Sequence, residues 1–372
     1  MPHKIGIDAR KLTDFGIGTY IEQLIRALAA LETEHLFYLF VGERHRHHLD
    51  DLPDNFRVVV ETSPVYSARE LLMLSWRLFR LKLDLYHATH YVLPAVVPCR
   101  AVVTIHDIIH LLYPQFLPSP VALLYARRMI RRSLTKADRI ITDSENTRSD
   151  LMEYFRVGGS NIEAIYPGVS ARFRRRLSEA EIRAVIEPLG VTRPYLLFVG
   201  NPKPHKNLDR IVRAYARALS LGSFQGDLVC VGERGNRDFK IRERARQLEI
   251  EDRLKLLGHV DDEALPALYQ GAELFLFPTL YEGFGLPVVE AMASGTAVIT
   301  SSNSALKEIA EGHARLVDPL DVEKIAQAIA GLMGDPERRL ELSRAGLERA
   351  EQFRWERTAR QTLAVYEKAL AN

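Results

Sequence analysis

Residues 274–300 read LFLFPTLYEGFGLPVVEAMASGTAVIT, and this stretch decides the fold. It begins with a short run of apolar residues and passes through a turn that contains two glycines. A helix-like segment then begins close to Pro287, a residue type that is favoured in the first turn of a helix. The stretch ends in a second short run of strand-forming residues at 297–300. A strand, a helix and a second strand in this order predict a parallel βαβ unit.

The same alternation extends in both directions and forms two series, separated by residues 170–192. In that segment the apolar periodicity weakens, arginines cluster, and Pro188 and Gly190 precede a new strand. We therefore predict an α/β protein with two Rossmann-like domains, residues 1–185 and residues 186–352, each with a parallel sheet. Strands are expected at residues 4–8, 36–41, 57–60, 85–88, 101–105, 139–143 and 162–166, then at 195–200, 227–232, 253–257, 274–277, 297–300 and 314–317.

Length and composition agree with two globular domains. The 372 residues are 47% hydrophobic and 26% charged, with a formal net charge of +2. This balance gives no basic field for nucleic acid, so we expect no nucleic-acid partner. The two cysteines lack the spacing of a zinc site. The chain starts directly with a strand-like run and has no signal-peptide pattern, which predicts a cytoplasmic protein.

A basic, mostly apolar helix pattern at residues 68–83 contains Trp76. One interpretation is core packing with a basic rim, and the other is a peripheral membrane contact. The longest apolar stretches, around residues 91–105, are interrupted by Pro94, Pro98 and Arg100. They are far shorter than the roughly 20 residues of a membrane-spanning helix, so any membrane contact is expected to be peripheral.

Two glutamates flank the glycine turn of the opening stretch. Gly283 and Gly285 would let backbone N–H groups approach an anionic oxygen, and the helix that follows adds a favourable dipole. Glu290, about one turn into the helix, would accept hydrogen bonds from the hydroxyls of a ribose. Glu282 in the loop would bind hydroxyls of a sugar. The alternative is one capping and one solvated glutamate.

Further polar residues follow the predicted strands, where ligands bind in open α/β sheets. Gly16 and Gly18 open a turn at a helix start that could surround a phosphate. His106 could bind a substrate hydroxyl, and Lys206 could place a positive charge on a diphosphate. Taken alone, the same residues also fit a tight connection, a structural histidine and a solvated lysine.

The run over residues 277–295 closely resembles the donor-binding signature of a large family of retaining GT-B glycosyltransferases, the group 1 type, which contains sucrose synthases and bacterial mannosyltransferases. The resemblance covers nearly the whole chain. It includes GIGTY at 16–20, TIHD at 104–107, ADRIITDS at 137–144, and residues 200–208, 316–319 and 353–356. It implies two facing Rossmann-like domains with the donor in the cleft between them, and a C-terminal helix, 353–372, that packs back on the first domain.

The resemblance also implies roles for individual residues. His106 would face the transferred sugar near its reacting carbon, and Lys206 would stabilise the leaving diphosphate. Asp107 would orient its loop. One departure is Asn201, where many relatives have arginine. Lys203 is the substitute cation we expect; the alternatives are a solvated Lys203 and, as the weaker candidate, a protonated His205. The catalytic set is thus His106, Lys206 and Glu282, and the donor-binding set is Gly16, Gly18, Asn201, Lys203, Val260, Gly283, Phe284, Gly285, Leu286 and Glu290.

The reaction implied by the resemblance is transfer of a sugar with retention of configuration. The chain contains no Asp-x-Asp pair, so we expect catalysis without a metal and without a cofactor. The pattern looks closest to the mannosyltransferases of bacterial surface polysaccharides. It therefore suggests GDP-mannose as donor and a saccharide or lipid-linked saccharide as acceptor. UDP-glucose and UDP-N-acetylglucosamine are alternative donors. A nucleotide-sugar 2-epimerase and a non-catalytic nucleotide-sugar binder are the rival functions.

Overall fold

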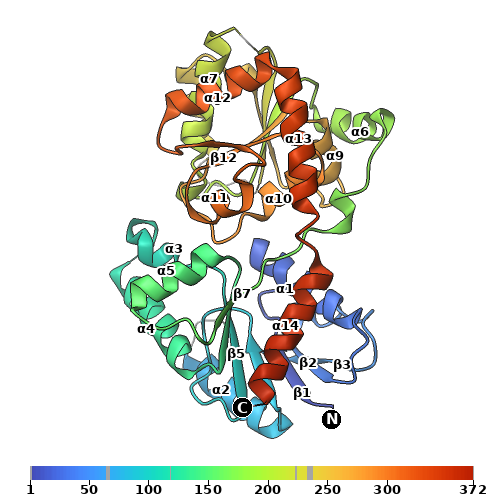
Figure 1. Cartoon of the computed structure of the whole chain (residues 1–372), viewed down its shortest axis with the longest axis vertical. Helices are drawn as coiled ribbons and strands as arrows, with labels where there is room; N and C mark the ends of the chain where they lie inside the picture. The colour runs from blue at the N-terminus through green and yellow to red at the C-terminus, as the bar shows by residue number, and fades with distance from the viewer. Residues whose placement is uncertain (1, 64–67, 118, 223, 233–237, 372) are drawn as a thin grey trace. The chain divides into compact units, whose positions relative to one another are not determined.

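A computed structural model describes residues 2–63, 68–117, 119–222, 224–232 and 238–371. The chain divides into two compact units (Figure 1). Unit 1 consists of Met1–Gly168 and Arg354–Asn372, and unit 2 consists of Val169–Phe353. Each unit is an α/β structure with one parallel sheet, as the alternating strand and helix patterns predict.

Unit 1 contains a seven-stranded sheet with the order β3-β2-β1-β4-β5-β6-β7, and all neighbouring strands pair in parallel. The strands are β1 (Lys4–Asp8), β2 (Leu36–Val41), β3 (Phe56–Val60), β4 (Leu85–Ala88), β5 (Arg100–Ile105), β6 (Arg139–Thr142) and β7 (Ile162–Ala164). The helices are α1 (Phe15–Ala29), α2 (Ala68–Leu81), α3 (Ile109–Leu112), α4 (Pro120–Lys136), α5 (Glu145–Phe155) and α14 (Trp355–Leu370).

Both faces of this sheet are buried, because successive side chains of a strand point to opposite sides. On β2, Phe37 and Leu39 belong to the hydrophobic cluster that also holds the apolar residues of α1 and α14. Tyr38 and Phe40 belong to a second cluster with α2, α4 and α5. The near-continuous apolar runs of the strands therefore match a sheet covered by helices on both sides.

Unit 2 contains a six-stranded parallel sheet with the order β10-β9-β8-β11-β12-β13. The strands are β8 (Tyr195–Val199), β9 (Asp227–Val231), β10 (Leu254–Gly258), β11 (Leu274–Phe277), β12 (Val298–Ser301) and β13 (Arg315–Val317). The helices are α6 (Glu179–Ile186), α7 (Leu208–Ser220), α8 (Asp238–Gln247), α9 (Leu265–Gly271), α10 (Leu286–Ala293), α11 (Ser304–Ala310), α12 (Val322–Gly334) and α13 (Pro336–Ala350). The opening stretch of sequence forms β11, α10 and β12, which confirms the predicted βαβ unit.

The division between the units differs from the expected one. It falls after Gly168 and before Arg354, whereas the sequence pattern placed the boundary after residue 185 and before residue 353. The reason is α6, which packs on α9: its Ile182 lies beside Gly271, so close that a Cβ on the glycine would stand 3.1 Å from it. Residues 169–185 therefore belong to unit 2, where α6 finds its apolar contacts. At the other end of the chain, α14 lies in unit 1, and Phe353 lies in unit 2.

The strand order reverses once in each sheet, between β1 and β4 in unit 1 and between β8 and β11 in unit 2. At such a point the two connecting loops leave the sheet toward opposite faces, so a crevice opens outside the carboxyl ends of the strands. Ligands of doubly wound sheets bind at this position. These two strand ends are therefore where a functional site is expected in each unit.

Candidate active site

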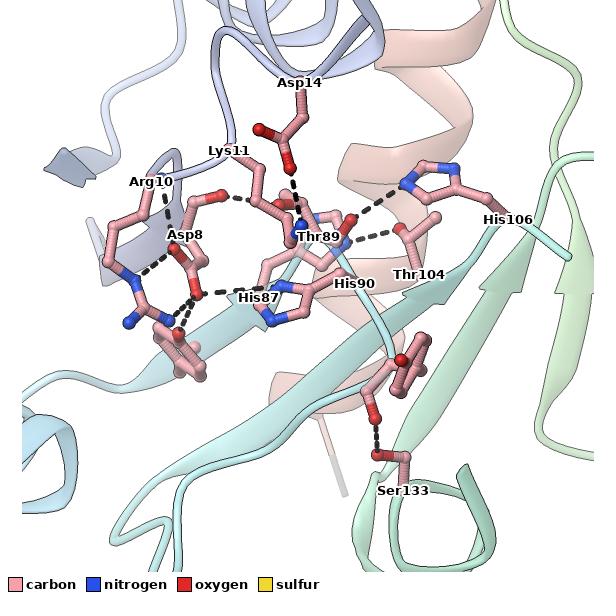
Figure 2. Close-up of polar contacts among 12 residues, drawn as sticks. Asp8, Arg10, Lys11, Asp14, His87, Thr89, His90, Thr104, His106 and Ser133 are labelled. Atoms are coloured by element: carbon pink, nitrogen blue, oxygen red, sulfur yellow. Dashed lines mark hydrogen bonds and ion pairs between the residues drawn. The ribbon is translucent and has the colours of Figure 1, made fainter. Parts of the chain in front are cut away.

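The reversal point of unit 1 is occupied by a buried polar cluster (Figure 2). Asp8, at the end of β1, accepts hydrogen bonds from Arg10 Nε at 2.8 Å and from Tyr86 Oη at 2.9 Å. Although burial alone would raise the pKa of Asp8, the adjacent guanidinium of Arg10 holds it well below its usual range. Thr89 Oγ1, in the loop after β4, donates to the backbone carbonyl of Asp8 at 2.5 Å. These bonds tie the loops after β1 and β4 together.

His106 follows β5 and lies at the rim of the same cluster (Figure 2). Its Nδ1 lies 2.7 Å from Asp143 Oδ2, and its Nε2 lies 2.9 Å from the carbonyl oxygen of Thr89. The ring of Tyr20 packs edge-on against the imidazole with 4.9 Å between the centroids. Burial lowers the pKa of His106, but the carboxylate of Asp143 outweighs this effect, so the pKa is raised overall.

A chain of buried hydrogen bonds connects this site to the C-terminal helix. His87 Nδ1 lies 2.7 Å from Tyr366 Oη on α14, and His87 Nε2 lies 2.8 Å from Thr104 Oγ1. Thr104 in turn contacts Tyr20 Oη at 3.3 Å. Burial lowers the pKa of His87 to about 3, so this histidine is neutral at physiological pH. This chain of hydrogen bonds therefore has a structural role and holds the residues that surround the site.

We expected the two N-terminal glycines to lie in a turn at the start of a helix. Instead, α1 already begins at Phe15, so both glycines lie within the helix. Gly16 is exposed in the first helical turn, and a Cβ there would meet no other atom within 4 Å. Gly18 is buried, and a Cβ would stand 2.2 Å from the carbonyl oxygen of Leu12. Close packing of the loop after β1 thus accounts for Gly18, while Gly16 remains open to a ligand. Asp107 accepts a hydrogen bond from the backbone N–H of Ile109 and so orders its own loop, as expected.

At the reversal point of unit 2, Lys206 and Glu282 meet. Lys206 Nζ donates to both carboxylate oxygens of Glu282, at 2.9 and 3.0 Å. The ammonium also lies 5.1 Å from the centre of the Phe277 ring. The side chains are 17% and 12% exposed, so the pair is shielded but reachable from solvent. The sequence placed both residues after strands, yet it gave no sign that they would pair with each other.

The glycine turn after β11 leads directly into α10. Gly285 has φ +104° and is the N-cap of the helix, and Pro287 lies in the first helical turn. A left-handed φ at this position favours glycine, since a side chain there would be strained. Gly283 is buried and Leu286 is half-buried. Phe284 is 5% exposed and packs edge-on against Phe353, with 5.5 Å between the ring centres. Packing is thus the role of the Phe284 side chain.

Glu290 lies on α10 and accepts a hydrogen bond from Tyr269 Oη at 3.0 Å. Burial raises the pKa of Glu290 to about 7, even though this bond and the nearby Arg172 act in the opposite direction. A carboxylate that is hard to ionise in the free protein would gain from new hydrogen-bond donors, such as the hydroxyls of a ribose. Glu290 is therefore suited to hold such a ligand.

Three other expected donor-binding residues lie in loops at the carboxyl edge of unit 2. Val260 is buried just beyond β10. Asn201 is half-buried, and Lys203 is exposed at the start of the short 3-10 turn Pro204–Lys206. Two glycines let the loops after β8 and β9 touch: a Cβ on Gly232 would stand 2.2 Å from the carbonyl oxygen of Gly200. The edge of the sheet thus carries no side chain where the loops after β8 and β9 touch.

Sequence reasoning missed the buried partners of the expected residues, above all Asp143 and Tyr269. A usable signal was present in Tyr86-His-Ala-Thr-His90, since two histidines at the end of a strand are unusual in a buried sheet. Within the described ranges no cluster of three or more His, Cys, Asp or Glu side chains could hold a metal ion.

Two models of known protein families match the chain, one over most of unit 1 and the other over most of unit 2. The family model described as "Glycosyl transferases group 1" matches residues 181–349, and the model "Glycosyltransferase Family 4" matches residues 16–173. The chain is 32% identical over 294 residues to the O-antigen chain mannosyltransferase B of Escherichia coli, covering 78% of this chain and 76% of that protein. The chain belongs to the group 1 glycosyltransferases.

A second mannosyltransferase and one solved structure are also similar to this glycosyltransferase. It is 33% identical over 248 residues to the MMP alpha-(1->4)-mannosyltransferase of Mycolicibacterium hassiacum, covering 65% of this chain and 57% of that protein. Its fold matches that of sucrose-phosphate synthase from Thermosynechococcus elongatus, with a TM-score of 0.81, 24% identity and 99% coverage of both chains. The fold is therefore GT-B, as the sequence motifs predict.

Proposed function

We propose that this glycosyltransferase moves mannose from GDP-mannose to a hydroxyl of a saccharide or lipid-linked saccharide, with retention of configuration and without a metal. Support for the sugar comes from the relatives named mannosyltransferases. Support for the chemistry comes from one arrangement: an ammonium paired with a carboxylate at the reversal point of unit 2.

The pair of Lys206 and Glu282 suits a donor that carries both an anion and hydroxyl groups. A sugar diphosphate would offer phosphate oxygens to the ammonium and sugar hydroxyls to the carboxylate, so both groups would exchange one good partner for another. In the free protein each charge of the pair already has an opposite charge beside it. As the bond between sugar and phosphate breaks, negative charge grows on the leaving diphosphate, and a fixed ammonium stabilises it.

The remaining expected residues complete this assignment. Glu290 would hold the ribose, and the N–H groups at the start of α10, from Gly283 to Leu286, would face the phosphates with the helix dipole behind them. Val260 would pack against the base. Gly16 would add an open backbone at the start of α1. His106 would contact the transferred sugar.

A thermal-shift screen followed by a transfer assay tests the function. We expect GDP and GDP-mannose to raise the Tm more than UDP, ADP or their sugars, because a ligand that binds only the folded state stabilises it by mass action. Transfer of labelled mannose to an acceptor should continue in EDTA, and the anomeric configuration of the product should match that of the donor. Preference for UDP-glucose or UDP-N-acetylglucosamine would replace the donor assignment.

The two rival functions differ in their products. A 2-epimerase would release nucleotide and an altered sugar from the donor alone, without any acceptor. A silent binder would be stabilised by donor yet show neither transfer nor slow hydrolysis. Acceptor-dependent appearance of a glycosylated product excludes both.

We also propose that the apolar face of α2 contacts an anionic membrane surface. Leu72, Trp76 and Phe79 are 67%, 50% and 71% exposed, whereas Leu74 and Leu78 on the same helix are buried in the core. Val96, which is 64% exposed, adjoins this face, because its N–H donates to Ser75 on α2 at 3.0 Å. No helix within the described ranges is long and apolar enough to cross a membrane.

The charges around this face favour anionic lipid as the occupant. Arg80 lies over the Trp76 ring at 5.2 Å. Helix α4, which packs over the same core cluster as α2, presents Arg127, Arg128 and Arg131 to solvent and carries no acidic residue. Basic side chains beside exposed aromatic residues are typical of helices that lie in a membrane interface.

Vesicle sedimentation tests this contact. We expect binding to vesicles that contain phosphatidylglycerol, weaker binding to pure phosphatidylcholine, and loss of binding in Trp76→Ser and Phe79→Ser. The control is Phe239→Ser, which removes a 68% exposed phenylalanine from α8 of unit 2. Equal binding by all three variants would contradict the proposal. A dimer in solution that the α2 variants dissociate would instead assign the face to a second copy of the chain.

A further inference from the structure

The surroundings of His106 define its charge as well as its position. Both ring nitrogens face hydrogen-bond acceptors, a carboxylate oxygen of Asp143 at 2.7 Å and the backbone carbonyl of Thr89 at 2.9 Å. A backbone carbonyl can only accept, so Nε2 must carry a proton. A neutral imidazole has one N–H and one acceptor nitrogen, whereas an imidazolium has two N–H donors. Donation from Nδ1 to the Asp143 carboxylate and from Nε2 to the Thr89 carbonyl therefore makes His106 an imidazolium.

Asp143 lies at the N-terminal end of a helix. It immediately precedes Ser144, the N-cap of α5, whose side chain accepts a hydrogen bond from the N–H of Thr147. The eleven residues of α5 direct the positive end of the helix dipole toward this point, and a carboxylate is stabilised there.

The other ionisable groups around His106 do not oppose a positive charge on it. Burial lowers the pKa of His87 to about 3 and that of His90 to about 4, so both are neutral near pH 7. Burial raises the pKa of Tyr20, which therefore remains a neutral phenol. Asp107, the neighbouring residue, also favours the protonated form of His106. The groups that surround the imidazole are thus Tyr20 from α1, His87 and His90 from β4 and the following loop, Asp107, and Asp143 from the loop after β6.

We propose that Asp143 is a positioning residue that holds His106 as an imidazolium, so that His106 acts as a fixed positive charge and not as a proton acceptor. This inference rests on the proposed function for the statement that His106 contacts the transferred sugar. It adds that no nitrogen lone pair of His106 is available to remove the proton of an acceptor hydroxyl. A fixed positive charge beside the sugar would instead stabilise the negative charge that develops on the leaving group.

The protonation state is measured directly by long-range ¹H–¹⁵N correlation spectra of the histidine rings, with the His106 signals assigned by their loss in His106→Gln. We expect both nitrogens of His106 to carry protons at pH 7.5 in the wild type. In Asp143→Asn the pKa of His106 should fall by about one unit or more, because the opposite charge within hydrogen-bond distance is lost. A single neutral tautomer in the wild type at pH 7.5 would overturn the proposal.

The matched control is Asp138→Asn, since Asp138 precedes the same strand β6 and binds Arg100 at 3.0 Å, at the opposite end of the sheet from His106. It should leave the His106 signals and the shape of the pH profile unchanged. Asp143→Asn should lower the rate of transfer about tenfold at pH 8 and shift the alkaline limb of the kcat profile to lower pH by the same interval as the pKa. A uniform loss at every pH, or the same shift in Asp138→Asn, would assign Asp143 a merely structural role. Absence of any transfer in the wild type would refute the proposed function and leave the spectra to decide the protonation state.

Discussion

The two reversal points are built from similar charges but satisfy them in different ways. In unit 1, Asp8 binds Arg10 and Tyr86, and His106 binds Asp143 and the Thr89 carbonyl, so the partners come from several loops and strands. In unit 2, Lys206 and Glu282 have each other as close charged partners, on the two loops that leave β8 and β11. The first arrangement is a fixed network and the second is a single pair.

This difference indicates which groups can exchange partners. Removing one member of the unit 1 network leaves several buried groups without hydrogen bonds, which is expensive. The pair in unit 2 is partly exposed, so solvent or a ligand can replace either member at lower cost. Unit 1 is therefore suited to supply preorganised electrostatics, and unit 2 is suited to bind and release a charged substrate.

The largest effect should come from Lys206→Met. If the ammonium stabilises the leaving diphosphate, its loss should lower kcat by about 100-fold or more, the usual result of removing one transition-state stabilising group. The affinity for GDP should change less. Both kcat and the Kd of GDP are needed, because loss of a group that acts only in binding would raise the Kd and leave kcat unchanged.

A second variant separates catalysis from stability in this pair. Lys206→Met leaves the carboxylate of Glu282 without its partner, which lowers the Tm for a purely structural reason. Lys206→Met combined with Glu282→Gln removes that unpaired charge and should restore most of the Tm without restoring kcat. Recovery of activity together with stability would show that the pair only holds the two loops. Lys307→Met, at an exposed lysine of α11, should change neither quantity.

The sequence predicted the fold almost completely, because buried parallel strands are short, nearly continuous apolar runs and crossover helices have a period of about 3.6 residues. The strands β1 and β11 begin and end at the predicted residues, 4–8 and 274–277. The boundary between the units was misplaced, since nothing in the pattern of α6 indicates which sheet it will cover. Glycine, carboxylate and lysine positions could be predicted as well, because loops after parallel strands gather at one edge of a sheet.

The partners of those residues could not be predicted, because they depend on contacts between distant segments. Asp143 lies 37 positions from His106, and Tyr269 lies 21 positions from Glu290. Neither spacing has a local signature. The same reason applies to Tyr366, which reaches His87 from 279 positions away. Pairing across such distances is decided by packing, and a single sequence contains no periodicity that reports it.

The next effect is expected from Glu290→Gln and has opposite signs for binding and stability. Donor affinity should fall about tenfold, because a charge-assisted hydrogen bond to the ribose becomes a neutral one. In the free protein the pKa of Glu290 is about 7, above its ordinary 4.5. The folded chain therefore holds a proton that the unfolded chain has released, and the free energy of unfolding falls as pH rises from 4.5 to 7.

Substitution by glutamine removes this cost. Glu290→Gln should be roughly 1 to 3 kcal/mol more stable than the wild type at pH 8 and equally stable at pH 4. Denaturant titrations at both pH values, together with the Kd of the donor, check the prediction. Glu311→Gln, an exposed glutamate after α11, serves as the control. Unchanged donor affinity in a folded Glu290→Gln protein would refute the ribose contact.

A smaller effect on activity is expected from Tyr366→Phe, which interrupts the buried chain behind His106. The hydroxyl contacts His87 Nδ1 at 2.7 Å, and its loss leaves a buried nitrogen unsatisfied. Stability should fall by roughly 1 to 3 kcal/mol, with little change in kcat. Tyr215→Phe removes a comparable bond, to the Gly226 carbonyl in unit 2, and is the matched comparison. If only Tyr366→Phe shifts the ¹⁵N signals of His106, the chain of hydrogen bonds influences the site. If neither variant shifts them, this chain of hydrogen bonds supports the fold alone.

The smallest effect should come from Lys203→Ala. The family resemblance leads us to expect an arginine in place of Asn201, so Lys206 alone would face two developing negative charges on the diphosphate. Lys203 lies three residues before Lys206, between Pro202 and Pro204, and is exposed. Because water and salt screen an exposed charge, its removal should lower kcat only about three- to tenfold, and the difference should shrink at 0.5 M salt.

Asn201→Arg provides the sharper half of this test, because it introduces a guanidinium at the position where the family resemblance leads us to expect one. Added to Lys203→Ala, it should recover most of the lost rate, whereas added to Lys206→Met it should recover little, since the group that binds Glu282 would still be missing. His205→Gln controls for the third basic residue of the turn, which would need to be protonated to assist. Full activity in Lys203→Ala at low salt would mean that Lys206 and the N–H groups at the start of α10 are sufficient. Unit 2 would then bind its diphosphate with one exchangeable cation.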